Sequence, residues 1–168
     1  MVTTRLVVAD DVEFLWEMVY WAAHVDEDEG VTLAEMRRDP DLIGHVAGWG
    51  RAGDLGVVAE LGGRRIGAAW LRRFDPATSD YSVFVDDDTP ELVIAVAPDH
   101  LGRGVGTTLL TALYERADAV VEATVLSVRA DSPAVRLYER IGFRELDRHT
   151  NRVGTESARM LRRIRRRS

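Results

Sequence analysis

Cysteine and lysine are both absent from this chain of 168 residues. The absence of cysteine excludes disulfides, thiolate metal sites and a cysteine nucleophile. The absence of lysine excludes Schiff-base chemistry and the P-loop, whose phosphate-binding lysine follows its last glycine. The scattered histidines form no paired-ligand motif, so we expect no metal. They are His24, His45, His100 and His149.

Long hydrophobic runs are also absent. No stretch is long enough to cross a bilayer, and the N-terminus lacks a basic start followed by an apolar core, so we expect a cytoplasmic protein with no membrane partner. The net charge of −6 argues against nucleic acid as a partner. Arginines gather at the C-terminal end, where we expect a solvated basic tail at 165–168.

The composition suits one globular domain. Hydrophobic residues make up 46% of the chain and charged residues 30%, enough for one core and a single domain at 1–164. Apolar stretches at 55–61 and 65–74 flank Gly62–Gly63, a pair that favours the tight turn of a β-hairpin. Asp10 with Glu13 has the spacing of a capping box at the start of the first helix.

The remaining segments complete the order of elements. A strand at 4–8 precedes the first helix, shorter helices follow, and two closing strands lie at 143–147 and 157–164. The order is strand, helices, three strands, helix, strand, helix and two strands. This order predicts an α/β fold with a mixed sheet.

The most informative stretch is a strand, a glycine-rich loop and a helix at 91–110. Residues 92–96 form a short apolar run rich in branched side chains, which predicts a buried strand that ends before Pro98. From Val105 the apolar positions recur with helical spacing. The loop contains Gly102, Gly104 and Gly106. Because glycine has no β-carbon, an anion could approach the free N–H groups of the first helical turn; a turn without a ligand is the alternative.

A second motif follows a short apolar strand at 125–128. Ser132 and Pro133 suit the start of a helix. Apolar side chains then recur at i, i+3, i+4 and i+7, and Gly142 ends the helix. These apolar residues are Ala134, Leu137, Tyr138 and Ile141.

The x-x-G-x-G loop and the A-x-x-L-Y-x-x-x-G-F segment together resemble two blocks of the GCN5-related N-acetyltransferase (GNAT) superfamily. The resemblance covers 91–146 strongly and the rest by topology only. It implies a single-domain mixed sheet of about seven strands flanked by helices. In this acyl-CoA N-acyltransferase fold two central parallel strands splay apart, here 91–97 and 125–128, and the cofactor lies between them.

The resemblance also implies which residues bind acetyl-CoA. Backbone groups of Ile94, Ala95 and Val96 would pair with its pantetheine arm. Main-chain N–H groups of the loop would hold its pyrophosphate. The loop residues are Leu101, Gly102, Arg103, Gly104, Val105, Gly106 and Thr107. Leu101 replaces the usual Arg or Gln, although Arg103 could supply charge nearby. Asp131 replaces the usual Asn, and its carboxylate is unfavourable beside a polyanion unless it points away.

Two residues resemble the catalytic groups of the family. Tyr138 would protonate the departing thiolate, since a phenol with a pKa of about 10 is a suitable acid. A core aromatic at the edge of the cleft is the alternative. Glu91 resembles the glutamate that some members use as a base, and a surface glutamate at a strand start is the alternative.

The resemblance implies an enzyme that transfers an acetyl group from acetyl-CoA to a primary amine of a small molecule by direct attack. The alternatives are an acetyltransferase for protein N-termini or side chains, and a catalytically silent CoA-binding regulatory module. Acidic runs at 26–29 and 86–88 suggest a cationic amine, although solvated loop acids explain them equally well. A homodimer is compatible with each of these hypotheses.

Overall fold

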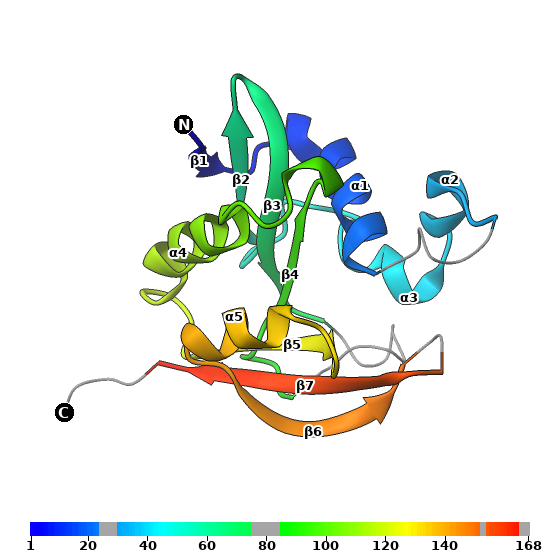
Figure 1. The fold of residues 1–168 in the computed structure, drawn as a ribbon, viewed down its shortest axis with the longest axis vertical. Coiled ribbons are helices and arrows are strands. Elements are labelled where there is room, and N and C mark those ends of the chain that lie inside the picture. The colour runs from blue at the N-terminus through cyan, green and yellow to red at the C-terminus, as the bar shows by residue number, and fades with distance from the viewer. Residues whose placement is uncertain (24–29, 75–84, 152–153, 165–168) are drawn as a thin grey trace.

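A computed structural model describes residues 1–23, 30–74, 85–151 and 154–164 of the chain (Figure 1). The acidic run at 26–29 and the basic tail at 165–168 lie outside the described residues. The strands are β1 (Thr3–Leu6), β2 (Leu55–Leu61), β3 (Arg64–Arg72), β4 (Glu91–Val96), β5 (Ala123–Arg129), β6 (Arg144–Thr150) and β7 (Glu156–Arg163). The helices are α1 (Val12–Ala22), α2 (Leu33–Met36), α3 (Pro40–Ile43), α4 (Val105–Ala117) and α5 (Ala134–Arg140), with 3-10 turns η1 (Ala9–Asp11) and η3 (Pro98–His100).

The seven strands form one mixed sheet in the order β1-β2-β3-β4-β5-β7-β6. Only the pair β4–β5 is parallel among the strand pairs of the described residues. The predicted hairpin of β2 and β3 is confirmed, and Gly62 and Gly63 both have the positive φ that its turn requires. The predicted α/β class with a mixed sheet is therefore confirmed.

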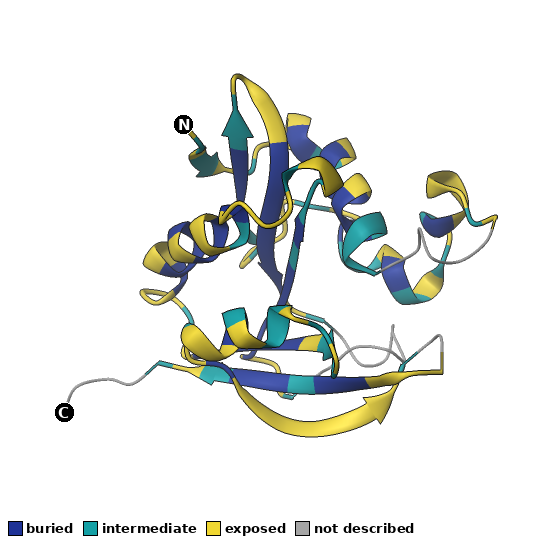
Figure 2. Ribbon diagram, viewed as in Figure 1, coloured by how far each residue is buried: buried dark blue, intermediate teal, exposed yellow. Residues whose placement is uncertain are grey.

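Helices cover the two faces of strands β2 to β4 (Figure 1). Helix α4 packs on one face and α1 on the other. The buried residues concentrate on the strands and on the helix surfaces that face them, whereas every residue of the edge strand β6 is exposed (Figure 2). The hydrophobic cluster on the α4 face extends across to β5, β7 and α5, so it holds the two halves of the sheet together on that side.

The two central strands β4 and β5 diverge. Their pairing is limited to one register pair, Glu91 with Val125, and the Val125 N–H donates to the Pro90 carbonyl at 3.0 Å. Beyond this point the strands separate, and Figure 1 shows the angle between them. The predicted splay is therefore confirmed, and beyond Glu91 it leaves one edge of β4 without a neighbouring strand among the described residues.

The start of the first helix differs from the prediction. Asp10 is exposed, and it is the carboxylate of its neighbour Asp11 that accepts the Val8 N–H at 2.8 Å. The predicted Asp10 and Glu13 capping box is therefore wrong, because Asp11 takes the N3 position of η1 and its carboxylate accepts from the N-cap residue Val8. Helix α1 follows η1 directly, with Asp11 at its N-cap position and no side-chain hydrogen bond to the first turn.

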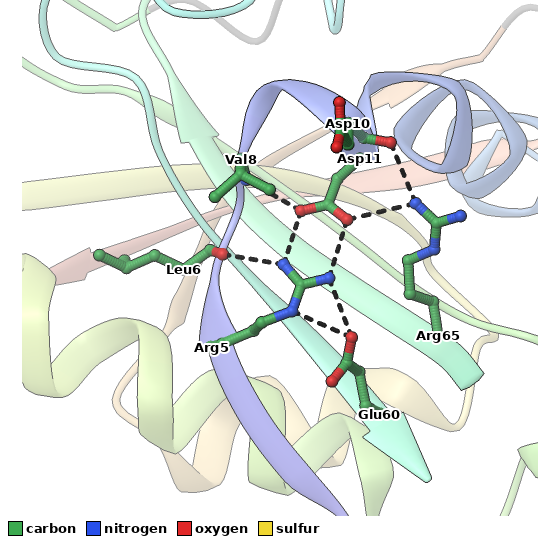
Figure 3. A network of polar contacts seen from close by, with 7 residues as sticks. All are labelled: Arg5, Leu6, Val8, Asp10, Asp11, Glu60 and Arg65. Carbon is green, nitrogen blue, oxygen red and sulfur yellow. Dashed lines mark hydrogen bonds and ion pairs between the residues drawn. The ribbon is translucent and has the colours of Figure 1, made fainter. Parts of the chain in front are cut away.

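Asp11 is the buried centre of a partly exposed polar network that joins β1, η1 and β3 (Figure 3). Its carboxylate accepts two hydrogen bonds from Arg5, at 2.7 and 2.9 Å, and one from Arg65 at 3.2 Å. Arg5 also contacts Glu60 on β2. Only 1% of Asp11 is exposed, and the hydrogen bond from Arg5 is the largest factor that lowers its pKa.

We expect Asp11→Asn to lower the free energy of unfolding by about 1 to 2 kcal/mol at neutral pH, because it removes the charge of a buried acceptor that holds two partly exposed arginines. A carboxyl group whose folded-state pKa is lowered stabilises the fold above its unfolded pKa and loses that effect as the pH falls through the folded value. The difference between variant and wild type should therefore shrink on acidification. Denaturant unfolding at several pH values measures it, and Asp10→Asn is the exposed control. Equal stability of both variants would contradict the role of the network.

Candidate active site

A cleft of about 810 Å³ opens where β4 and β5 diverge. One wall consists of β4, the glycine loop and the start of α4, and the other of β5 and α5. The C-terminal end of α1 and the α3 segment also line it. The strand, loop, helix motif and the α5 motif, which are separate in the sequence, thus meet across one cleft.

The glycine loop exposes the N-terminus of α4 to the cleft. Gly102 and Gly104 have φ angles of 72° and 78°, which only glycine adopts without strain. Gly104 is the N-cap of α4, and no side chain of the described segments caps it. A β-carbon at either position would meet no atom within 4 Å among the described residues, so the space beside the loop is open. This arrangement suits an anion held by main-chain N–H groups.

The loop residues are not all placed alike. The described lining of the cleft includes Leu101, Gly102, Gly104, Val105, Gly106 and Thr107. Arg103 is exposed and does not belong to that lining, and neither does Asp131, which is also exposed. The fold therefore brings the main chain of the loop to the cleft without either of these two charged side chains.

The free edge of β4 lies along the same cleft. On its other edge Ile94, Ala95 and Val96 pair with β3. Gly67 of β3 allows a close approach there, because a β-carbon would lie 3.0 Å from the Ala95 carbonyl oxygen and 3.1 Å from Leu109. On the β5 side the described residues supply no strand beyond Glu91. An extended ligand could therefore pair with β4 as an added strand would.

Tyr138 reaches the cleft from α5 and belongs to the core as well. It is 9% exposed, and its ring packs edge-to-face on Phe143 with centroids 5.9 Å apart. Burial raises the pKa of its phenol to about 12. The hydroxyl is therefore protonated at neutral pH and can donate into the cleft. The helix begins one residue later than predicted, at Ala134, whose N–H donates to the Ser132 hydroxyl at 3.2 Å.

Glu91 is buried at the point where β4 and β5 part. Its residue exposure is 9%, and its Oε2 has no hydrogen-bond partner among the described residues. Its Oε1 lies 3.6 Å from Nε2 of His45. Of the two sequence-based alternatives for this residue, the exposed surface glutamate does not hold.

Sequence reasoning missed His45, which follows α3 and lines the cleft. Its Nδ1 lies 3.1 Å from the Leu42 carbonyl oxygen, and its ring packs against Phe74. Two side chains of β3 hold its backbone: Trp70 donates to the His45 carbonyl at 3.0 Å, and Arg72 donates to the Gly44 carbonyl at 3.1 Å. The Asp39–Pro40 helix start places this segment, but no local pattern reveals its neighbour on β4.

Two sequence-based expectations concern charge and metal. The acidic run at 86–88 lies outside the described lining, and Asp86 accepts hydrogen bonds from the Asp88 N–H and the Thr89 hydroxyl, which is turn chemistry. The described part of the chain contains no group of three or more acidic or histidine side chains placed to hold a metal. It also contains no helix with the length and hydropathy of a membrane span.

Comparison with known proteins gives three kinds of match. The model of the Acetyltransferase (GNAT) domain family matches residues 52–145. Mycothiol acetyltransferase of Tsukamurella paurometabola is 36% identical over 92 residues, which are 54% of this chain and 29% of that protein. The chain thus spans less than a third of this curated relative.

Two solved structures share the fold. The ribosomal-protein-alanine N-acetyltransferase of Brucella melitensis superposes with a TM-score of 0.69 at 22% identity, over 96% of this chain and 99% of the other. The aminoglycoside acetyltransferase AAC(6')-Ib, in complex with coenzyme A and kanamycin, gives a TM-score of 0.61 at 24% identity, over 97% and 95% of the two chains. Below 25% identity these matches support the architecture.

Proposed function

Because the chain belongs to the GNAT acetyltransferase family, we propose that it transfers an acetyl group from acetyl-CoA to the primary amine of a small molecule. The observation that carries this proposal is the divergence of β4 and β5 beside the glycine loop. It places an unpaired strand edge and an uncapped helix N-terminus along one cleft, as an extended ligand with a pyrophosphate requires.

The residues of the cleft suit acetyl-CoA, which would supply an activated acyl thioester when bound. Main-chain groups of Ile94, Ala95 and Val96 would bind the pantetheine arm. Main-chain N–H groups from Leu101 to Thr107 would bind the pyrophosphate. Arg103 and Asp131 contribute to neither in this proposal, since their exposed side chains lie outside the described lining.

Two side chains would transfer protons, one as acceptor and one as donor. A primary amine reaches the site mostly as an ammonium ion, so its proton must leave before the nitrogen attacks the acyl carbon. Glu91 would receive this proton at its carboxylate, whose buried Oε2 has no hydrogen-bond partner among the described residues. As the carbon–sulfur bond breaks, the Tyr138 hydroxyl would donate its proton to the thiolate. Burial raises its pKa, so the hydroxyl is protonated in the resting site and is a weaker acid than a free phenol.

The acceptor would bind on the side of the cleft formed by α1 and α3. The cleft volume of about 810 Å³ lies within the usual range for small-molecule sites. Asp41 and Glu91 line it and give this side acidic character. The likeness to an aminoglycoside acetyltransferase points in the same direction, so we propose an acceptor that carries cationic groups besides the reacting amine.

The proposed function includes three further predictions from the sequence. Residues 1–164 act as one domain, since their strands form one sheet. The protein works in the cytoplasm. A homodimer stays a prediction that a sedimentation measurement can check.

A thiol-release assay tests the function. We would incubate the protein with acetyl-CoA and each of four acceptors: kanamycin, spermidine, ethanolamine, which carries no cationic group besides the reacting amine, and a peptide with an N-terminal alanine. We expect free thiol with kanamycin or spermidine, at a rate that falls severalfold between low and physiological salt because charge attraction is screened. Faster turnover of the peptide would favour a protein acetyltransferase. Tight CoA binding without turnover of any amine would favour a silent regulatory module.

A further inference from the structure

We infer that His45 and Glu91 act as one proton-accepting pair, in which Glu91 contacts the amine and His45 acts through it. This inference rests on the proposed function and assigns a positioning residue to it. It comes from three observations: the contact between the two side chains, the fixed tautomer of the imidazole, and the burial of both groups.

The tautomer follows from the contacts of the ring. The Leu42 oxygen is a carbonyl and can only accept, so Nδ1 of His45 carries a hydrogen toward it at 3.1 Å. In neutral His45 the other nitrogen, Nε2, therefore has a lone pair. That lone pair faces Glu91 Oε1 at 3.6 Å, and the carboxylate also presents lone pairs. Two facing lone pairs repel each other. A proton between Nε2 of His45 and Oε1 of Glu91 is therefore held strongly.

The surroundings of His45 also favour a proton held between the His45 and Glu91 side chains. Burial, the largest single factor, lowers the pKa of its imidazole, but the hydrogen bond and charge of Glu91 together with the Leu42 carbonyl outweigh it, and the net shift is upward. Arg72 on β3 opposes protonation, although Asp54 accepts two hydrogen bonds from its guanidinium at 3.2 Å each. Asp41 lines the same cleft from α3 and adds negative charge.

The pair can accept the proton of the amine only when His45 is neutral. When His45 is protonated, a second proton on Glu91 would leave an uncompensated imidazolium in a buried site. When His45 is neutral, Glu91 can take a proton from the ammonium ion, and the pair ends as imidazolium and carboxylate. The amine lone pair then forms the bond to the acyl carbon while the carbon–sulfur bond breaks. The acceptor strength of Glu91 is thus set by a neighbour that never touches the substrate.

The pH dependence of turnover tests the pair. With saturating acetyl-CoA and the best amine of the panel above, kcat of the wild type should fall on acidification with a midpoint above 6.5, the ordinary pKa of histidine. In His45→Gln the midpoint should move down by at least one pH unit, and the plateau should fall by about tenfold because the remaining base is weaker. A residue that only packs against Phe74 would change stability or KM and leave the midpoint in place.

Two further measurements keep the test decisive. In Glu91→Gln, adding His45→Gln should change kcat less than twofold, since a pair is not additive. Nitrogen NMR of the free protein should show His45 titrating above 6.5, and below it in Glu91→Gln, where only the Leu42 carbonyl still opposes the effect of burial. Turnover with an unchanged acid midpoint in His45→Gln, or an NMR titration indifferent to Glu91, would overturn the pair and leave the proposed function intact. Absence of turnover with every amine would overturn both.

Discussion

Replacing Glu91 with glutamine should lower kcat by about 10²-fold at neutral pH. The substitution keeps the shape of a side chain that is 9% exposed, and it replaces one carboxylate oxygen by an NH2 group and removes the basic charge that would receive the proton of the ammonium ion. The loss should shrink as the pH rises, because a primary amine with a pKa of about 10 then arrives increasingly without its extra proton.

Steady-state kinetics from pH 6 to 9 measure this effect. The matched control is Glu115→Gln, the same substitution at an exposed position of α4, and it should leave kcat unchanged. If the Glu91 variant keeps nearly normal kcat over the whole range, the amine loses its proton by another route and the proposed role of Glu91 is wrong.

Replacing Gly104 with valine should weaken binding of CoA by tenfold or more. The backbone there has φ of 78°, and an added side chain would extend into the open space beside the N-terminus of α4. That space is where a pyrophosphate would accept main-chain hydrogen bonds, and loss of one or two charge-assisted contacts corresponds to at least a factor of ten.

The hairpin supplies a close control. Gly63 also has φ of 78°, and a β-carbon there would likewise meet no atom within 4 Å among the described residues. Both valine variants should therefore lose about 1 to 2 kcal/mol of unfolding free energy through the left-handed backbone. Only Gly104→Val should lose affinity in a calorimetric titration with CoA. Equal affinities would remove the loop from the cofactor site.

The elements that could be predicted from the sequence are those with strong local patterns. The Gly62–Gly63 turn, the apolar run from Leu92 to Val96 and the helical spacing after Val105 each depend on residues close in the chain, and the structure confirms all three. The separation of β4 from β5 had no local signal. It was expected because two motifs, read together, resemble a family.

The contacts that were missed join segments far apart in the chain. His45 meets Glu91 because Trp70 and Arg72 hold the α3 segment against the sheet, and no periodicity encodes such a contact. The capping box was assigned to Asp10 because spacing alone does not distinguish neighbouring carboxylates. Asp131 shows the related limit, since the position of a residue within a motif does not give the direction of its side chain.

The divergence of β4 and β5 also affects how binding and folding are linked. On the α4 face one hydrophobic cluster spans both halves of the sheet, whereas on the α1 face the cluster includes β2, β3 and β4 and stops at β4. A ligand that contacts both walls of the cleft would therefore connect two parts that the sheet itself joins only near Glu91. Its binding free energy would add to the free energy of unfolding, by about 2.7 kcal/mol at a ligand concentration one hundred times Kd. Thermal stability would then depend on the concentration of CoA.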